Sequence, residues 1–130
     1  FLIDGAYDLC RALKKDFRLY IVTNGVSSTQ YSRLSATGLD RLMADIFVSE
    51  DAGAQKPQKD FFDYIAARIP DYDPGEALVV GDSLTSDIQG GINAGIDTCW
   101  YNPDREKNLL DIHADYEIHT LEELPALLKH

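Results

Sequence analysis

The chain has 130 residues, and 45% of them are apolar, so it is long enough for one domain with a hydrophobic core. Its 22 acidic and 12 basic residues give a net charge of −10 at pH 7, which disfavours binding to a nucleic-acid backbone. No apolar run is long enough to span a membrane and no targeting signal is visible, so we expect a cytoplasmic protein without a nucleic-acid or membrane partner.

Segments with helical and strand-like apolar patterns alternate along the chain, and this alternation predicts an α/β fold with a parallel sheet. We expect helices near residues 5–16, 28–37, 58–69, 85–94 and 121–129, and strands near 19–23, 46–49, 77–81, 97–101 and 115–118.

The strand predicted at 19–23 ends in small polar residues, with Thr23, Asn24 and Gly25 following the apolar run. A hydroxyl group beside the unpaired N–H groups of a following helix suits a phosphate, because the helix dipole favours an anion there. Ordinary capping of that helix by a serine or threonine explains the same pattern, so it stays an alternative.

A lysine, Lys56, lies just before a proline that opens the helix predicted at 58–69. A loop lysine is usually a solvated surface residue, and Lys56 alone therefore indicates little.

The strand predicted at 77–81 breaks at Gly81 and is followed by two carboxylates, Asp82 and Asp87. Ligands of open parallel sheets bind in the crevice at the carboxyl ends of the strands, and a glycine there lets the chain turn sharply. Ser83, Thr85 or Ser86 can cap the next helix, which places Asp87 in its first turn. An acidic turn that merely caps a helix is the alternative.

The order of these features, Thr23, then Lys56, then Asp82 with Asp87, resembles the haloacid dehalogenase superfamily of phosphohydrolases. The resemblance covers the chain from about residue 4 to residue 103 and implies a Rossmann-like core of three layers around a parallel sheet. The segments 21–25, 46–51, 56–57 and 81–87 look most like a subgroup of capped 5'-nucleotidases that act on pyrimidine nucleotides.

The resemblance also implies roles for the site residues. Thr23 would donate a hydrogen bond to a phosphoryl oxygen, with Asn24 and Gly25 completing the phosphate-binding loop, and Lys56 would neutralise the phosphoryl charge. Asp82 would ligate Mg²⁺ directly, while Asp87 would hold a metal-bound water or orient the site. Magnesium suits this set because it uses one or two carboxylates, the substrate's phosphate and several waters.

The family's first motif, a strand that ends Asp-x-Asp and supplies the nucleophile, does not occur in a matching place. Asp71-Tyr72-Asp73 has the spacing but lies between two prolines and predicts a turn. At the amino end, Asp4 follows an apolar run, yet Leu2 would stand in the nucleophile's position. Without the nucleophile the chain cannot form the aspartyl-phosphate of the family.

We therefore expect residues 1–130 to be a partial core domain, the carboxyl-terminal part of a longer enzyme, without the first central strand and the cap. The missing half of the same protein would then be a required partner. Because unpaired backbone groups in a sheet are costly, the chain must leave a gap, pair the strands that end in Thr23 and Gly81 directly, or borrow a strand.

Several other residues receive a structural interpretation. Cys10 and Cys99 suit small buried side chains of a reducing compartment. Asp51 fits a loop acid, with orientation of Lys56 as the alternative. For Trp100 to Pro103 we expect core packing, with a place near the substrate crevice as the alternative. His113, His119 and His130 are expected at the surface or in caps.

The leading hypothesis is a magnesium-dependent phosphomonoesterase that acts on a small phosphorylated substrate, a nucleoside monophosphate. The alternative is a module that binds phosphate and metal without turnover. A response-regulator receiver is disfavoured because its residues run Asp, Thr, Lys along the chain. A metal-free dehalogenase is disfavoured because a cation-binding aspartate would serve no purpose there.

Overall fold

A computed structural model describes residues 6–128 of the chain. The chain divides into two compact units, Phe1–Gly53 and Ala54–His130, and each is described by itself. Asp4, considered above as a displaced first motif, lies outside the described residues.

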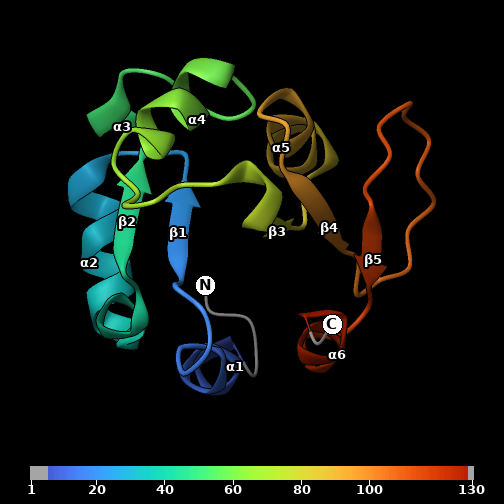
Figure 1. Cartoon of the computed structure of the whole chain (residues 1–130), viewed down its shortest axis with the longest axis horizontal. Helices are drawn as coiled ribbons and strands as arrows, with labels where there is room; N and C mark the ends of the chain where they lie inside the picture. The colour runs from blue at the N-terminus through green and yellow to red at the C-terminus, as the bar shows by residue number, and fades with distance from the viewer. Residues whose placement is uncertain (1–5, 129–130) are drawn as a thin grey trace. The chain divides into compact units, whose positions relative to one another are not determined.

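The first unit is built on a pair of parallel strands, which Figure 1 shows as adjacent arrows. Thr23 lies opposite Val48 in the strand register, so the chain leaves both strands at the same edge of the pair. Phe47 and Val48 are buried, and the rings of Tyr20 and Phe47 stack with their centres 5.9 Å apart. The elements are α1 (Ala6–Leu13), β1 (Tyr20–Thr23), α2 (Ser27–Thr37), a 3₁₀ turn (Leu39–Leu42), β2 (Asp45–Val48) and α3 (Ser49–Ala52).

The second unit holds a sheet of three parallel strands in the order β3-β4-β5. Its middle strand is the most buried, with Cys99 fully buried and Trp100 nearly so. The elements are α4 (Lys59–Ala66), β3 (Leu78–Gly81), η3 (Leu84–Ile88), α5 (Gln89–Asn93), β4 (Asp97–Tyr101), β5 (Tyr116–Ile118) and α6 (Leu124–Leu128), with 3₁₀ turns at Pro74–Glu76 and Leu121–Glu123.

Two buried glycines let the short helix α5 approach its neighbours closely. A Cβ atom on Gly90 would lie 2.6 Å from a ring carbon of Phe62 in α4, and one on Gly91 would lie 2.5 Å from Cγ2 of Thr98 in β4. Neither contact leaves room for a methyl group. The absence of side chains at these positions therefore fixes how α5 packs in this unit.

The predicted alternation of helices and strands is confirmed, but several elements differ in length. The helix predicted at 58–69 ends at Ala66, and the helix predicted at 85–94 is a π-helical turn, η3, followed by α5. A one-turn helix, α3, begins where the strand at 46–49 was expected to end. Asp71 lies in a turn, as expected, and Asp73 caps the 3₁₀ turn that follows by accepting a hydrogen bond from the Gly75 N–H.

The parallel α/β class is confirmed, and the described strands form two parallel sheets, one in each unit. The strand that ends in Thr23 pairs with β2, and the strand that ends in Gly81 pairs with β4.

The two cysteines are free thiols, and Cys99 has the expected character of a buried core residue. Burial raises the pKa of the Cys99 thiol to about 11, with a smaller contribution from the charge of Glu123. Burial also raises the pKa of Cys10. Both side chains therefore stay protonated at neutral pH, which makes them poor nucleophiles and poor metal ligands.

None of the helices within residues 6–128 has the length and apolar character needed to cross a membrane.

Gly91→Ala should lower the free energy of unfolding by about 1–3 kcal/mol, because the added methyl overpacks the contact with Thr98. Alanine is the better helix former by roughly 0.5–1 kcal/mol, so a loss of stability isolates the steric effect. Urea unfolding measures the change, with Ile92→Ala on the exposed side of the same helix as the control. An unchanged or increased stability in Gly91→Ala would contradict the close packing of α5 on β4.

Candidate active site

The loop after β1 carries the residues expected to bind phosphate. The Thr23 hydroxyl is partly buried and lies 3.3 Å from the Asn24 carbonyl oxygen, to which it donates. The side chain of Gln30 donates to the same oxygen at 3.1 Å. Gly25 has a φ of +148° and packs against Gln30, an arrangement that only glycine adopts readily.

The helix that follows this loop is not capped by one of its own serines or threonines, so the capping alternative is wrong in that form. Its N-cap residue is Val26, whose side chain cannot accept a hydrogen bond. Instead, Glu50 of α3 accepts from the Ser27 N–H at 2.9 Å, and Ser49 accepts from the Gly25 N–H at 2.8 Å. No local sequence signal indicates these contacts of Ser49 and Glu50, because their partners lie 24 and 23 residues away along the chain.

In the second unit, Lys56 forms an ion pair with Asp87. Both side chains are largely withdrawn from solvent, at 12% and 13% exposure, which makes this pair much less screened than a surface pair. The second carboxylate oxygen of Asp87 accepts from the Ser83 N–H at 3.3 Å. Lys56 is therefore not the solvated surface lysine that its loop position alone suggested.

Gly81 permits this arrangement because the Asp87 side chain lies directly against its α-carbon. A Cβ atom at Gly81 would overlap the Asp87 carboxyl group. Ser83 caps the turn that carries Asp87 by accepting a hydrogen bond from the Ser86 N–H at 3.2 Å. Of the three caps that the sequence allowed, Ser83 is therefore the one that forms. The sequence from Gly81 to Asp87 is thus a compact turn that points Asp87 back to the strand's end.

Asp82 follows the end of β3 and is exposed. Its carbonyl oxygen accepts a hydrogen bond from the indole N–H of Trp100 at 3.1 Å. Trp100 pairs with Gly81 in the strand register and is only 6% exposed. The expected core packing of Trp100 is confirmed, and the residue also holds the backbone of Asp82, a contact that the sequence did not reveal.

The donor set of this unit fits a magnesium ion held largely by water and substrate. Asp82 offers an exposed carboxylate, and the Asp87 carboxylate lies in the turn that follows it. No group of three or more metal-ligating side chains occurs in the part of the chain that the structure describes. One or two carboxylates are nevertheless what magnesium commonly uses in phosphoryl-transfer sites.

Asp51 and the histidines have other partners. Asp51 accepts hydrogen bonds from the hydroxyl groups of Ser27 at 2.6 Å and Tyr31 at 3.1 Å, so it belongs to the network around α2. His113 and His119 lie beside Asp111 and Glu117, in agreement with a surface role. His130 lies outside the described residues.

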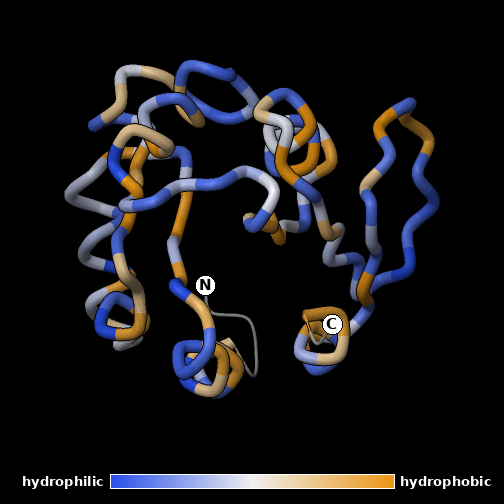
Figure 2. Tube along the Cα trace, viewed as in Figure 1, coloured by the Kyte–Doolittle hydropathy of each residue, from blue (hydrophilic) through white to orange (hydrophobic). Residues whose placement is uncertain are grey.

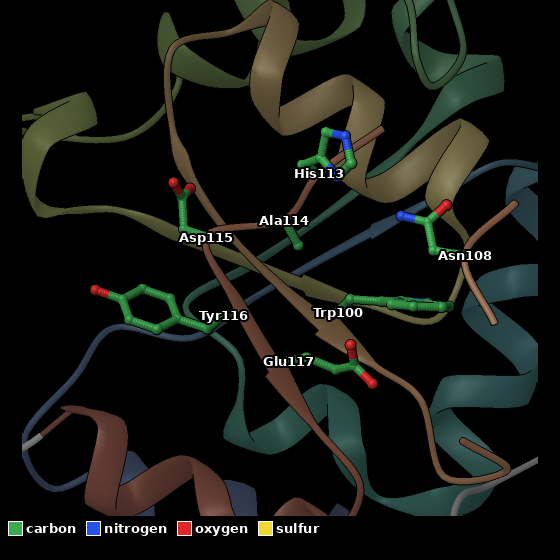
Figure 3. Close-up of a pocket in the computed structure, with 7 residues that line it drawn as sticks. All are labelled: Trp100, Asn108, His113, Ala114, Asp115, Tyr116 and Glu117. Carbon is green, nitrogen blue, oxygen red and sulfur yellow. The ribbon is translucent and has the colours of Figure 1, made fainter. Parts of the chain in front are cut away.

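A pocket of about 290 Å³ lies beside β4 and β5 (Figure 3). Its polar side chains bind the backbone or side chains outside the lining: Asp115 accepts from the Thr98 N–H at 2.9 Å, and Glu117 accepts from the Asn102 side-chain amide at 3.1 Å. The connection from β4 to β5 projects beyond the sheet (Figure 1), and its far end has apolar stretches on either side of a hydrophilic one (Figure 2). These groups stabilise the connection, and none of the predicted site residues lines the pocket. The lining residues are Trp100, Asn108, His113, Ala114, Asp115, Tyr116 and Glu117.

Residues 1–95 match the family model of the haloacid dehalogenase-like hydrolases. The chain belongs to the haloacid dehalogenase-like (HAD-like) hydrolases. The match includes every predicted site residue, from Thr23 to Asp87.

Three relatives show strong similarity over nearly the whole chain. The HAD-hydrolase YfnB of Bacillus subtilis is 56% identical over 127 residues, covering 98% of this chain and 54% of the relative. The pyrimidine 5'-nucleotidase PynA of Streptococcus pneumoniae is 41% identical, covering 94% of this chain and 52% of the relative. The pyrimidine 5'-nucleotidase YjjG of Escherichia coli is 39% identical, covering 97% and 56%.

A crystal structure of YfnB bound to magnesium matches the chain with a TM-score of 0.96 at 55% identity, covering 99% of this chain and 57% of that one. The chain thus spans about half the length of the relatives it matches.

A double-mutant cycle with Lys56→Met and Asp87→Asn tests the ion pair. Because both side chains are largely buried, we expect a coupling energy of about 1–3 kcal/mol from urea unfolding. The exposed pair Lys59 and Asp63, with side chains 65% and 59% exposed, is the matched control and should couple by no more than about 0.5 kcal/mol. Equal coupling energies in the two pairs would show that burial does not strengthen the ion pair between Lys56 and Asp87.

Proposed function

We propose that the intact protein is a magnesium-dependent phosphomonoesterase that acts on pyrimidine nucleoside monophosphates. The observation that carries the proposal is the buried Lys56–Asp87 pair in the same turn region as an exposed Asp82. A structural ion pair needs no exposed carboxylate beside it, whereas a phosphate and metal site needs both a cation and a free acidic ligand.

Each predicted residue has a role that follows from its environment. The Thr23 hydroxyl, which donates only a long bond to Asn24, would donate to a phosphoryl oxygen when substrate binds. Lys56 would balance the negative charge of the phosphoryl oxygens. Asp87 would hold Lys56 in place and limit its motion, because one of its oxygens accepts from Lys56 and the other from Ser83.

Asp82 would be the direct ligand of magnesium, because it is exposed while Asp87 is committed to Lys56. The hydrogen bond from Trp100 would fix the backbone of Asp82 and so limit where its carboxylate can reach. Bound magnesium would supply charge neutralisation at the phosphoryl group. The ion pair with Asp87 holds Lys56 and the hydrogen bond from Trp100 holds the Asp82 backbone, so little reorganisation would be needed when charge develops.

The substrate class rests on two relatives that are named pyrimidine 5'-nucleotidases, PynA and YjjG. A nucleotide is compatible with the net charge of −10, because magnesium and Lys56 provide local positive charge for its phosphate. Nothing in the described residues reads a base. We therefore propose that base selection resides in the remaining part of the intact protein.

Turnover would also require that remaining part. No strand within residues 6–128 ends in the Asp-x-Asp sequence that supplies the family's nucleophile. We propose that residues 1–130 alone bind phosphate and magnesium weakly and do not hydrolyse phosphomonoesters.

In the intact protein, Asp82→Asn and Lys56→Ala should each lower kcat/KM for UMP by about 100- to 1000-fold, since each removes a group that stabilises transition-state charge. Release of orthophosphate measures the rate at saturating Mg²⁺. Asp63→Asn, which removes an exposed acid in α4, should leave the rate within about 3-fold of the wild type.

Removal of magnesium by chelation should abolish activity in the wild type, and added Mg²⁺ should restore it. Asp82→Asn should need a higher Mg²⁺ concentration for half-maximal activity, whereas Lys56→Ala should not. Full activity in EDTA, or an Asp82→Asn variant as active as the wild type, would contradict the proposal. Binding of phosphate and Mg²⁺ by the intact wild type without any turnover would favour the non-catalytic module instead.

A further inference from the structure

Residues of the turn that follows β2 form hydrogen bonds with the loop that follows β1 and hold it in place. The two strands are in parallel register, with Thr23 opposite Val48, so Asn24 and Ser49 leave the sheet at the same edge. The four-residue helix α3 begins there and places three successive polar side chains beside the other loop. These side chains are Ser49, Glu50 and Asp51.

Each of these three side chains engages a different group of the loop or of α2. The Ser49 hydroxyl accepts from the Gly25 N–H at 2.8 Å and lies 3.3 Å from the Gly25 carbonyl oxygen. Glu50 accepts from the Ser27 N–H at 2.9 Å. Asp51 accepts from the Ser27 hydroxyl at 2.6 Å and from Tyr31 one turn further along α2.

The start of helix α2 receives its side-chain acceptor from α3, because its own N-cap residue supplies none. Its N-cap is Val26 without a side-chain cap, and its first turn has no acidic residue. The first N–H groups of a helix need acceptors from outside the helix. Glu50 therefore acts as a cap supplied by another element, and it fixes the backbone between Gly25 and Ser27.

We infer that Glu50, with Ser49, is a positioning residue that holds the Thr23–Gly25 loop in the conformation that binds the substrate's phosphoryl group. This inference rests on the proposed function. The loop would contact phosphoryl oxygens in the bound substrate and in bound orthophosphate alike. Loss of the hydrogen bonds from this loop to Ser49 and Glu50 should therefore weaken the binding of substrate and of orthophosphate. The KM and the inhibition constant of orthophosphate should rise together.

The test compares Glu50→Ala, Glu50→Gln and the matched control Asp63→Ala in the intact protein. Asp63 is also an exposed acid, but it pairs with Lys59 in α4. For Glu50→Ala we expect KM for UMP and Ki for orthophosphate to rise in parallel by about 10-fold, with kcat within about 3-fold of the wild type. Glu50→Gln keeps an acceptor oxygen, so it should restore both constants to within about 3-fold of the wild type.

A merely structural role gives a different result. If Glu50→Ala lowers only the folded fraction, kcat per total protein falls while KM and Ki stay at their wild-type values, and the inference is overturned. Equal defects in Glu50→Ala and Glu50→Gln would overturn it as well, since charge rather than the hydrogen bond would then matter. If Glu50→Ala does not fold, Ser49→Ala decides, because it removes the acceptor of the Gly25 N–H and should raise the same two constants.

Failure of the proposed function looks different. A wild-type protein that neither hydrolyses phosphomonoesters nor binds orthophosphate overturns the function and the inference together. A wild-type protein that is active, with constants that no Glu50 or Ser49 variant changes, overturns the inference alone.

Discussion

The ion pair between Lys56 and Asp87 is the interaction on which the site of the second unit depends. It ties the segment before α4 to the turn after β3, although the two residues lie 31 positions apart in the chain. The pair also explains two neighbouring features. Gly81 leaves the space that the Asp87 carboxyl group occupies, and Ser83 holds that group's second oxygen. Asp82 remains exposed, so the two acids of this turn have different environments and can have different roles.

In the first unit, the parallel strand register brings two loops together. Because Thr23 and Val48 lie opposite each other, the loops after β1 and β2 start side by side, and one can serve as the scaffold of the other. Exposed polar residues of α3 thereby become part of the support for a loop that carries the predicted phosphate ligands. In the first unit, the shared edge where β1 and β2 end thus brings together polar residues that are distant in the sequence.

The sequence predicted those features that depend on local pattern. The apolar runs, Ser83 as a cap and Asp87 in the following turn all follow from residue order. Contacts over long sequence distances were not predictable in this way. Neither Glu50 as the cap of α2 nor Trp100 as the support of Asp82 has a local signal, since each depends on the strand register. The division of the helix expected at 85–94 into η3 and α5 was not predicted either, and the close contacts of Gly90 with Phe62 and of Gly91 with Thr98 within α5 have no local signal.

The central claim is that Asp82 serves the metal while Asp87 serves Lys56. A crystal structure of the intact protein with Mg²⁺ and orthophosphate tests it most directly. We expect an Asp82 carboxylate oxygen at about 2.0–2.1 Å from Mg²⁺, with the ion pair between Lys56 and Asp87 retained. A magnesium ion bound by Asp87 with Lys56 released, or one bound away from Asp82, would contradict the claim.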